Sequence, residues 1–269
     1  MDTMRIVRAM MIGDVVGEPG LKALEENLPR LIKDNAVDFT VANGENAADG
    51  FGLTEATMKR MLATGIDVIT SGNHVWEKRE FWQTMDAENR VLRPANYPGP
   101  AAGRGWVSTK KADANWVVAN VQGRELMTAI DCPFRCVDDI VKHASGQAIV
   151  LVDFHAESSR EKESLAYHLD GRVTLLVGTH THVQTADERI LPQGTAYITD
   201  LGMTGISDSV IGMDSKICLD RVRKQVMYRM EPAKDQEDGK SRTQIQGIVA
   251  EIDAESGKAV SIRRLPPFS

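Results

Sequence analysis

Residues 173–182 read VTLLVGTHTH, an apolar run that ends in two histidines separated by one threonine. Such a run is typical of a buried strand in a parallel sheet, and open α/β sheets bind ligands at the carboxyl ends of their strands. Two imidazoles at positions i and i+2 are unusual as packing, because neutral imidazole needs hydrogen-bond partners for both nitrogens. The stretch therefore favours an α/β fold in which His180 and His182 are metal ligands at a strand end.

Two further histidines stand in the same position relative to an apolar run. His74 follows IDVITSGN at residues 66–73, and His155 follows AIVLVDF at residues 148–154. Histidine is the commonest side-chain metal ligand and the usual proton shuttle near neutral pH. We therefore expect four of the six histidines at one edge of one sheet, which indicates a metal-dependent hydrolase.

Strand and helix patterns alternate along the rest of the chain. Apolar periodicity predicts helices over 21–35, 54–64, 77–86, 136–143 and 161–169, and strands over 5–12, 39–42, 68–70, 106–109, 116–120, 148–154, 173–177, 195–199 and 245–252. Residues 245–252 could pair with 259–264 as a hairpin, and 13–17, 93–100 and 231–242 are expected to be turns or loops. The simplest architecture is one α/β domain over residues 1–269, with antiparallel additions late in the chain.

Polar residues follow other predicted strands. Asp14 could bind a metal, although read alone it is better explained as a turn or helix-capping residue. Glu45 could bridge two metals and Asn46 could add a carbonyl oxygen, but both would also suit a solvated turn. Asn73 could likewise give its carbonyl oxygen to a metal, which leaves the adjacent His74 free to act as an acid or, equally, as a capping histidine.

Net charge and apolar content limit which molecules the chain is expected to bind. The 269-residue chain has a net charge of −6 and no run of Lys or Arg, so duplex nucleic acid is not expected, whereas a small phosphate substrate is compatible. No run of 18 apolar residues occurs, so no membrane span is expected. Three cysteines, Cys132, Cys136 and Cys218, suggest a reduced cytoplasmic protein, and a homo-oligomer is compatible with the sequence.

Taken in order, Gly13-Asp14, Gly44-Glu45-Asn46, Gly72-Asn73-His74, His155 and His180-Thr181-His182 resemble the motifs of the calcineurin-like metallophosphoesterases, and within them those of the bacterial YmdB-like family. The common superfamily pattern begins Asp-x-His, but Val16 stands two residues after Asp14, and Glu45 stands where Asp is usual. Both features match the YmdB-like branch. The resemblance covers nearly the whole chain and implies a calcineurin-like sandwich, with β-sheets flanked by helices and a metal site at the carboxyl ends of the strands.

The resemblance also implies an activity and a ligand set. The family hydrolyses 2′,3′-cyclic nucleotides, with a metal-bound hydroxide as nucleophile at a binuclear centre. One metal would take Asp14, Glu45, Asn46 and His182, and the other would take Glu45, Asn73, His155 and His180. His74 would be the proton donor. The two metal ions would be iron, with manganese as a common substitute.

Charge supports this activity, while other functions stay open. Only Asp14 and Glu45 bring negative charge to the implied ligand set, so two divalent ions would leave a positive site that suits a phosphodiester anion. A phosphomonoesterase or nuclease on the same centre is an alternative, as is a regulatory metalloprotein with incidental catalysis. In the Pro-rich segment, Arg93 and Asn96 could touch substrate or could serve only the structure of the loop.

Overall fold

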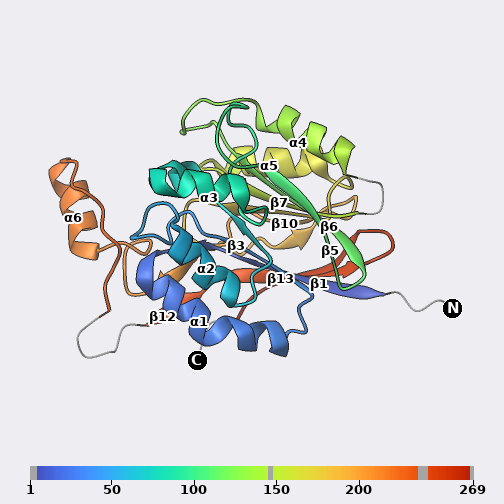
Figure 1. Ribbon diagram of the computed structural model, residues 1–269, viewed down its shortest axis with the longest axis horizontal. Helices are drawn as coiled ribbons and strands as arrows, with labels where there is room; N and C mark the ends of the chain where they lie inside the picture. The colour runs from blue at the N-terminus through green and yellow to red at the C-terminus, as the bar shows by residue number, and fades with distance from the viewer. Residues whose placement is uncertain (1–4, 145–147, 236–241, 267–269) are drawn as a thin grey trace.

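Two large β-sheets form the body of the computed structural model, which describes residues 5–144, 148–235 and 242–266 (Figure 1). The five-stranded sheet has the order β14 (Ala259–Arg264), β13 (Gly247–Asp253), β1 (Ile6–Ile12), β3 (Phe39–Asn43) and β4 (Val68–Thr70). The six-stranded sheet has the order β5 (Trp106–Lys111), β6 (Ala114–Gln122), β7 (Ala148–His155), β8 (Leu175–Thr179), β10 (Ala196–Ile198) and β9 (Arg189–Ile190). A small third sheet joins β12 (Thr243–Ile245), β11 (Met203–Ile206) and β2 (Asp14–Val15).

The two large sheets pack face to face, as the side chains of β1 show. Val7, Ala9 and Met11 belong to the apolar core between the sheets, together with residues of β6, β7 and β8. Met10 and Ile12 point the other way, into a separate core. This alternation follows from the two-residue period of a strand.

Helices cover the outer face of each sheet (Figure 1). The core that includes Met10 also contains residues of α1 (Gly17–Asp34) and α2 (Glu55–Ala63). The outer face of the six-stranded sheet packs against α4 (Pro133–His143) and α5 (Ser159–Leu169). The layers therefore run helix, sheet, sheet, helix, which confirms the sandwich that the sequence predicted.

The prediction that all four strand-end histidines lie at one edge of one sheet is wrong. His74 follows β4 of the five-stranded sheet, whereas His155, His180 and His182 end or follow β7 and β8 of the six-stranded sheet. The reason is that β5 and β6 form a hairpin that begins the second sheet, after the parallel run of β1, β3 and β4 ends. The carboxyl ends of the two parallel runs meet because the sheets are stacked.

Buried polar contacts join these carboxyl ends across the sandwich. The Asp153 carboxylate in β7 accepts a hydrogen bond from Nδ2 of Asn43 at 3.1 Å and another from the hydroxyl of Thr70. Asn43 and Thr70 are the last residues of β3 and β4. The two sheets are thus held in register where the polar strand-end residues gather.

Two segments differ locally from their predictions. Residues 13–17 were expected to form a turn, but Asp14–Val15 pairs in parallel with Met203 and Thr204 of β11, a partner remote in sequence. The helix predicted over 77–86 is divided, because Lys78 has an extended backbone. The short turn η1 (Asn73–Trp76) precedes this stretch, which holds the turn η2 (Arg79–Phe81) and then α3 (Trp82–Ala87).

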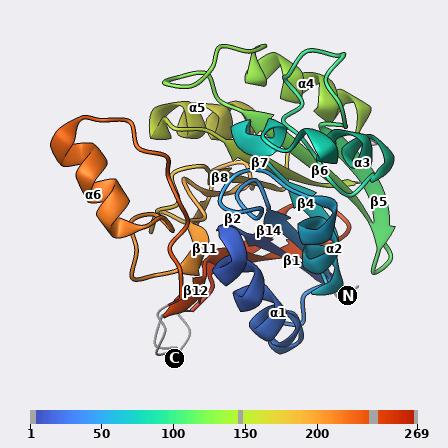
Figure 2. The same cartoon turned by 60° about the vertical axis from the view of Figure 1, so that its left-hand side comes forward.

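The C-terminal third holds both a confirmed element and a missed one. The hairpin between β13 and β14 is confirmed, with Asp253 and Lys258 closing its turn. Helix α6 (Ser215–Lys224) was not predicted, and it projects from the body in both Figures 1 and 2. Of the loop predicted over 231–242, residues 236–241 lie outside the described residues. Across the described ranges, no helix combines the length and apolar character needed to cross a bilayer.

Candidate metal centre

The polar residues that follow the strands come together at one end of the sandwich. Asp14 is in β2, Glu45 and Asn46 follow β3, Asn73 and His74 begin η1 after β4, His155 ends β7, and His180 and His182 follow β8. The side chains of Asp14, Glu45, Asn46, His155 and His182 are buried, and those of Asn73, His74 and His180 are partly buried. Every residue predicted to bind metal therefore lies in this cluster, with His74 beside it.

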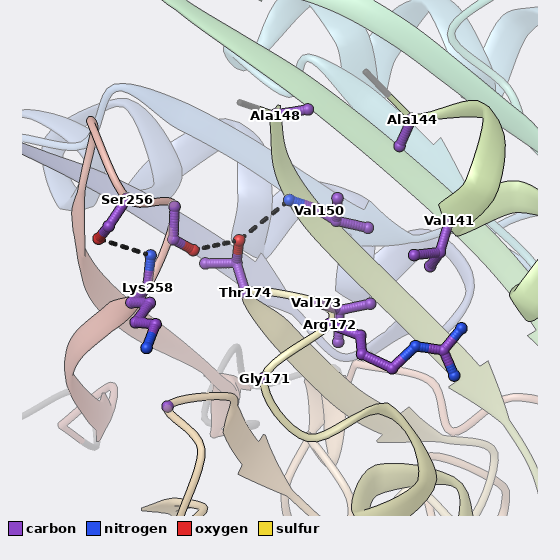
Figure 3. Close-up of a pocket in the computed structure, with 12 residues that line it drawn as sticks. Val141, Ala144, Ala148, Val150, Gly171, Arg172, Val173, Thr174, Ser256 and Lys258 are labelled. Atoms are coloured by element: carbon purple, nitrogen blue, oxygen red, sulfur yellow. Dashed lines mark hydrogen bonds between the residues drawn. The ribbon is translucent and has the colours of Figure 1, made fainter. Parts of the chain in front are cut away.

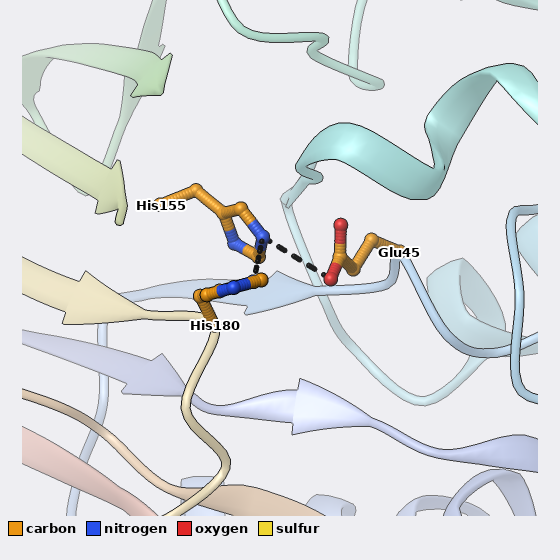
Figure 4. A group of neighbouring side chains, drawn as sticks. All are labelled: Glu45, His155 and His180. Carbon is orange, nitrogen blue, oxygen red and sulfur yellow. Dashed lines mark hydrogen bonds and ion pairs between the residues drawn. The ribbon is translucent and has the colours of Figure 1, made fainter. Parts of the chain in front are cut away.

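One group of side chains converges on Nε2 of His155 (Figure 4). This atom lies 3.2 Å from Oε1 of Glu45, 3.2 Å from Oδ1 of Asn73 and 3.0 Å from Nδ1 of His180. Glu45, His155 and His180 together offer three donor atoms that all lie within 4.8 Å of one another. The spacing suits a single cation bound among them.

A second group shares Glu45 with the first. Glu45, Asp14 and His182 again offer donor atoms within 4.8 Å of one another, and Nε2 of His182 lies 3.9 Å from Oδ1 of Asp14. Asn46 belongs to the same loop as Glu45, and its Nδ2 donates to the carbonyl of Gly50 at 2.9 Å. Two neighbouring groups that share one carboxylate match the arrangement needed for two metal ions held close together.

Each of the three histidines directs one ring nitrogen outward to a fixed partner. The Nδ1 atom of His155 contacts Oγ1 of Thr179 at 2.9 Å, and Nδ1 of His182 contacts the carbonyl of Ile211 at 2.8 Å. The Nε2 atom of His180 lies 3.1 Å from the Glu157 carboxylate. The opposite ring nitrogens, Nε2 of His155 and His182 and Nδ1 of His180, face the cluster, where each can offer a lone pair to a cation. Partners of this kind normally orient the histidines that ligate metals.

Two buried oxygens in the cluster have no hydrogen-bond partner among the described residues, which bears on whether a cation fits there. Oδ1 of Asp14 and Oδ1 of Asn46 are buried and have no hydrogen-bond partner among the residues that the structure describes. A buried acceptor without a partner costs free energy. A divalent cation would supply the missing partner for both, so the residues fit a metal site.

Burial and mutual attraction set the charges of the cluster. Burial raises the pKa of Asp14 to about 7. Burial opposes the charges of His155 and Glu45, but their attraction prevails and raises the pKa of His155 to about 9 while it lowers that of Glu45 to about 2. Burial and the charge of His155 lower the pKa of His180 to about 3. Without a bound cation, the imidazolium of His155 balances Glu45, and a divalent cation would take the place of its proton.

His74 is close to the cluster without belonging to either group. Its backbone amide donates to Oε2 of Glu45 at 3.2 Å, and its ring packs edge-on against Phe51 with the ring centres 4.9 Å apart. The Nδ1 atom lies 3.5 Å from the Glu77 carboxylate, and the side chain is 28% exposed. His74 thus lines the entrance to the cluster, where an imidazole can meet a bound molecule.

The entrance is a cavity of about 330 Å³ that is lined by both polar and apolar side chains. Its polar lining residues are Glu45, Asn46, His74, Glu157, His180, Thr181 and His182, and its apolar ones are Phe51, Ile211, Met213 and Met230. Ligand sites are concave, mostly apolar and fitted with a few fixed polar groups. The cavity therefore suits a small molecule that has a charged part and an apolar part.

Arg93 and Asn96 turn inward to the loop that carries them. The guanidinium of Arg93 donates to the carbonyls of Pro94, Ala95 and Ala102. The side chain of Asn96 pairs with both backbone groups of Gln122. Both residues are buried, so they serve the structure of the loop rather than a contact with substrate.

A second cavity lies at the opposite ends of the same strands (Figure 3). It has a volume of about 240 Å³. Its lining includes Ala148 and Val150 at the start of β7, together with Thr174 and Lys258. The hydroxyl of Thr174 bonds to the Val150 amide and the Gly257 carbonyl. Its described lining contains no His, Cys, Asp or Glu, so it offers no metal site comparable to the one above.

Sequence reasoning missed the residues that orient the histidines. Glu157 and Thr179 stand within two residues of a strand end, so their proximity to the cluster could have been inferred from the motifs. The carbonyl of Ile211 carries no such signal, because it approaches His182 through a loop that begins after β11. Cys132 and Cys136 are free thiols, and neither belongs to the donor groups of the cluster.

Comparisons with known proteins agree with this architecture. The family model described as YmdB-like protein matches residues 10–265. The 2′,3′-cyclic-nucleotide 2′-phosphodiesterase of Bacillus subtilis is 42% identical over 260 residues, which cover 96% of each chain. The crystal structure of a novel phosphatase from Mycoplasma pneumoniae is 29% identical, with a TM-score of 0.90 over 98% of this chain and 94% of that one.

A more distant structure shows the fold alone. The NAD nucleotidase of Haemophilus influenzae is 12% identical and has a TM-score of 0.57, over 98% of this chain and 50% of that one. The two chains therefore share a fold.

Proposed function

The chain belongs to the YmdB-like family, and on that premise we propose that it is a metal-dependent phosphodiesterase that hydrolyses 2′,3′-cyclic nucleotides. The observation that carries the proposal is the pair of donor groups that share Glu45. The relative from Bacillus subtilis, named as a phosphodiesterase for these compounds, supports the choice of substrate.

We assign two metal ions to the cluster, iron or its substitute manganese. Asp14, Glu45, Asn46 and His182 would hold one, and Glu45, Asn73, His155 and His180 would hold the other. Bound divalent ions would lower the pKa of a water molecule and attract the oxygens of the phosphodiester. Asp14 and Glu45 contribute the only carboxylates of this set, so the loaded site keeps a positive charge that favours an anionic substrate.

His74 is proposed as the proton donor. The leaving group of a cyclic nucleotide is a ribose oxygen, which departs poorly unless it receives a proton. His74 faces the cavity and does not belong to either donor group, so its imidazole can carry a proton to that oxygen. The apolar residues of the lining would exclude water from around the nucleoside.

A phosphomonoesterase is the second candidate, because the similar structure from Mycoplasma pneumoniae is described as a phosphatase. Turnover of three substrates would separate the two: 2′,3′-cyclic AMP, 3′,5′-cyclic AMP and an aryl phosphate monoester. The proposal expects the first to be hydrolysed with the highest kcat/KM. Preference for the monoester would overturn the substrate assignment and favour the phosphatase.

The metal part of the proposal needs its own measurement. Metal analysis of the purified protein, read beside turnover of 2′,3′-cyclic AMP before and after treatment with a chelator, should show bound metal and loss of activity on its removal. Full activity in protein stripped of metal would contradict the metal centre and leave the fold assignment untouched.

A further inference from the structure

Lys162 of α5 and Asp200 form an ion pair inside the protein, next to the segment that carries His180 and His182. The Nζ atom of Lys162 donates to Oδ2 of Asp200 at 2.7 Å, and each side chain is only 1% exposed. Lysine is almost never fully buried unless it is paired. A buried ion pair is by itself weak evidence for stability, because desolvation of both charges offsets their attraction. The other contacts of Asp200 indicate a different role.

Both carboxylate oxygens of Asp200 also accept backbone hydrogen bonds. Oδ2 accepts from the amide of Thr181 at 3.2 Å, and Oδ1 accepts from the amide of Gly202 at 2.8 Å. The carbonyl of Gly202 in turn accepts from the amide of Asp14 at 3.1 Å. One carboxylate therefore contacts the residue between the two histidines and, through Gly202, the backbone of Asp14.

The backbone that Asp200 holds is in an unfavourable conformation. His180 has φ 101° and His182 has φ 63°, both in the left-handed region that favours glycine. Residues other than glycine keep such a conformation only where their surroundings enforce it, and they cluster at functional sites. The hydrogen bond from Thr181 to Asp200 lies between the two strained residues, where it can enforce both.

Gly178 leaves the space through which the side chain of Lys162 reaches Asp200. A Cβ atom at Gly178 would lie 2.7 Å from Cδ of Lys162 and 1.8 Å from the carbonyl oxygen of Thr199. A side chain there would displace both the lysine and the backbone of Thr199. The glycine that precedes Thr179 in the sequence is thus explained by close approach to the buried pair.

We propose that the Lys162–Asp200 pair is a positioning device that holds the segment from His180 to His182 and the backbone of Asp14 in the geometry that metal binding needs. The inference rests on the proposed metal centre. Lys162 pairs with Asp200 in the interior, where the carboxylate accepts three hydrogen bonds, from Lys162, Thr181 and Gly202. Neither residue touches the metal or the substrate.

The test uses the double variant Lys162→Met/Asp200→Asn, which removes both charges and so leaves no uncompensated ion in the interior. The first readout is the affinity of the purified, metal-stripped protein for Mn²⁺ alone. Loss of partners that orient metal ligands typically lowers metal affinity about 10- to 100-fold, and we expect a loss in that range. The second readout, made without metal, is hydrogen exchange of the Thr181 amide, which we expect to accelerate.

The matched control is Leu165→Ala, a buried position one turn further along α5 in the outer core. It destabilises the same helix without removing a contact of Asp200, so it should lower the melting temperature yet keep wild-type Mn²⁺ affinity and Thr181 protection. A double variant that binds Mn²⁺ as tightly as wild type, or that keeps Thr181 protected, would overturn the positioning role. An equal loss of affinity in Leu165→Ala would overturn it too, because general destabilisation would then suffice.

Failure of the proposed function would look different. If wild-type protein bound no Mn²⁺, the metal centre would be wrong, whereas the exchange of Thr181 in the metal-free proteins would still decide whether the pair holds the segment.

Discussion

The Nε2 atom of His155 lies 3.2 Å from Oε1 of Glu45, although the strands that lead to the two residues belong to different sheets of the sandwich. Glu45 follows β3 and His155 ends β7, so their contact depends on how the sheets stack. Gly72 lies at the same junction. A Cβ atom there would come within 2.2 Å of the His155 ring and 2.3 Å of Oε2 of Glu45.

Gly72→Ala should therefore separate Glu45 from His155 and weaken metal binding. We expect Mn²⁺ affinity to fall by about tenfold or more, because the added methyl group displaces two ligands directly. Titration of the metal-stripped protein with Mn²⁺ measures the effect. Gly99→Ala is the control, since a Cβ at Gly99 meets nothing within 4 Å. Equal affinities for the two variants would show that the junction tolerates the methyl group.

Thr179→Val should loosen His155 while keeping the shape of the side chain. The hydroxyl of Thr179 contacts Nδ1 of His155 at 2.9 Å and donates to Oδ1 of Asp153 at 2.7 Å. Valine removes both contacts, so Mn²⁺ affinity should fall about 10- to 100-fold. Thr179→Ser restores a hydroxyl and should recover most of the affinity. If serine fails to rescue, the hydroxyl is not what orients the ring.

His74→Ala should separate chemistry from metal binding. His74 lines the cavity but belongs to neither donor group, so the variant should keep its metal and lose about 10²- to 10⁴-fold in kcat for 2′,3′-cyclic AMP. His180→Ala provides the contrast, because it removes a proposed ligand and should lose metal. Metal content and kcat are measured for both variants. A His74→Ala protein that has lost its metal would refute the assignment of His74 as a proton donor.

Arg60 links α2 to α1 and should make a pH-dependent contribution to stability. Its guanidinium lies 2.7 Å from the carboxylates of Glu18 and Glu25 and lowers the pKa of both. Carboxyls with a lowered pKa stabilise the fold above their unfolded pKa of 4.5, and that stability is lost as the pH falls through their folded values. Arg60→Met should therefore be less stable than wild type at pH 7, and the difference should shrink at pH 3.

The expected difference at pH 7 is small, below about 1 kcal/mol, because these side chains are partly exposed and water screens them. Urea unfolding at the two pH values measures it. Arg30→Met is a suitable control, since it removes the same charge at a side chain that is 81% exposed. A difference for Arg60→Met that persists unchanged at pH 3 would mean that packing, not charge, is responsible.

Much of the site could be predicted from sequence because the signals are local. An apolar run followed by a polar residue predicts a strand and what stands at its end, and this placed His155, His180 and His182 correctly at the ends of β7 and β8. Local signals also act at the start of α2, where the Thr54 side chain caps the helix and Oγ1 of Thr57 accepts a hydrogen bond from the Thr54 amide.

The sequence by itself determined which residue types stand at the strand ends, because burial and strand period act within a few residues of each other. Tertiary structure alone decided that two stacked sheets supply them, that Asp14 lies in a strand paired with β11, and that Lys162 reaches Asp200 past Gly178. Those contacts join segments far apart in the chain, and no local preference encodes a distance between them. The motif at 178–182 specifies two histidines, but the interior that surrounds it fixes where they point.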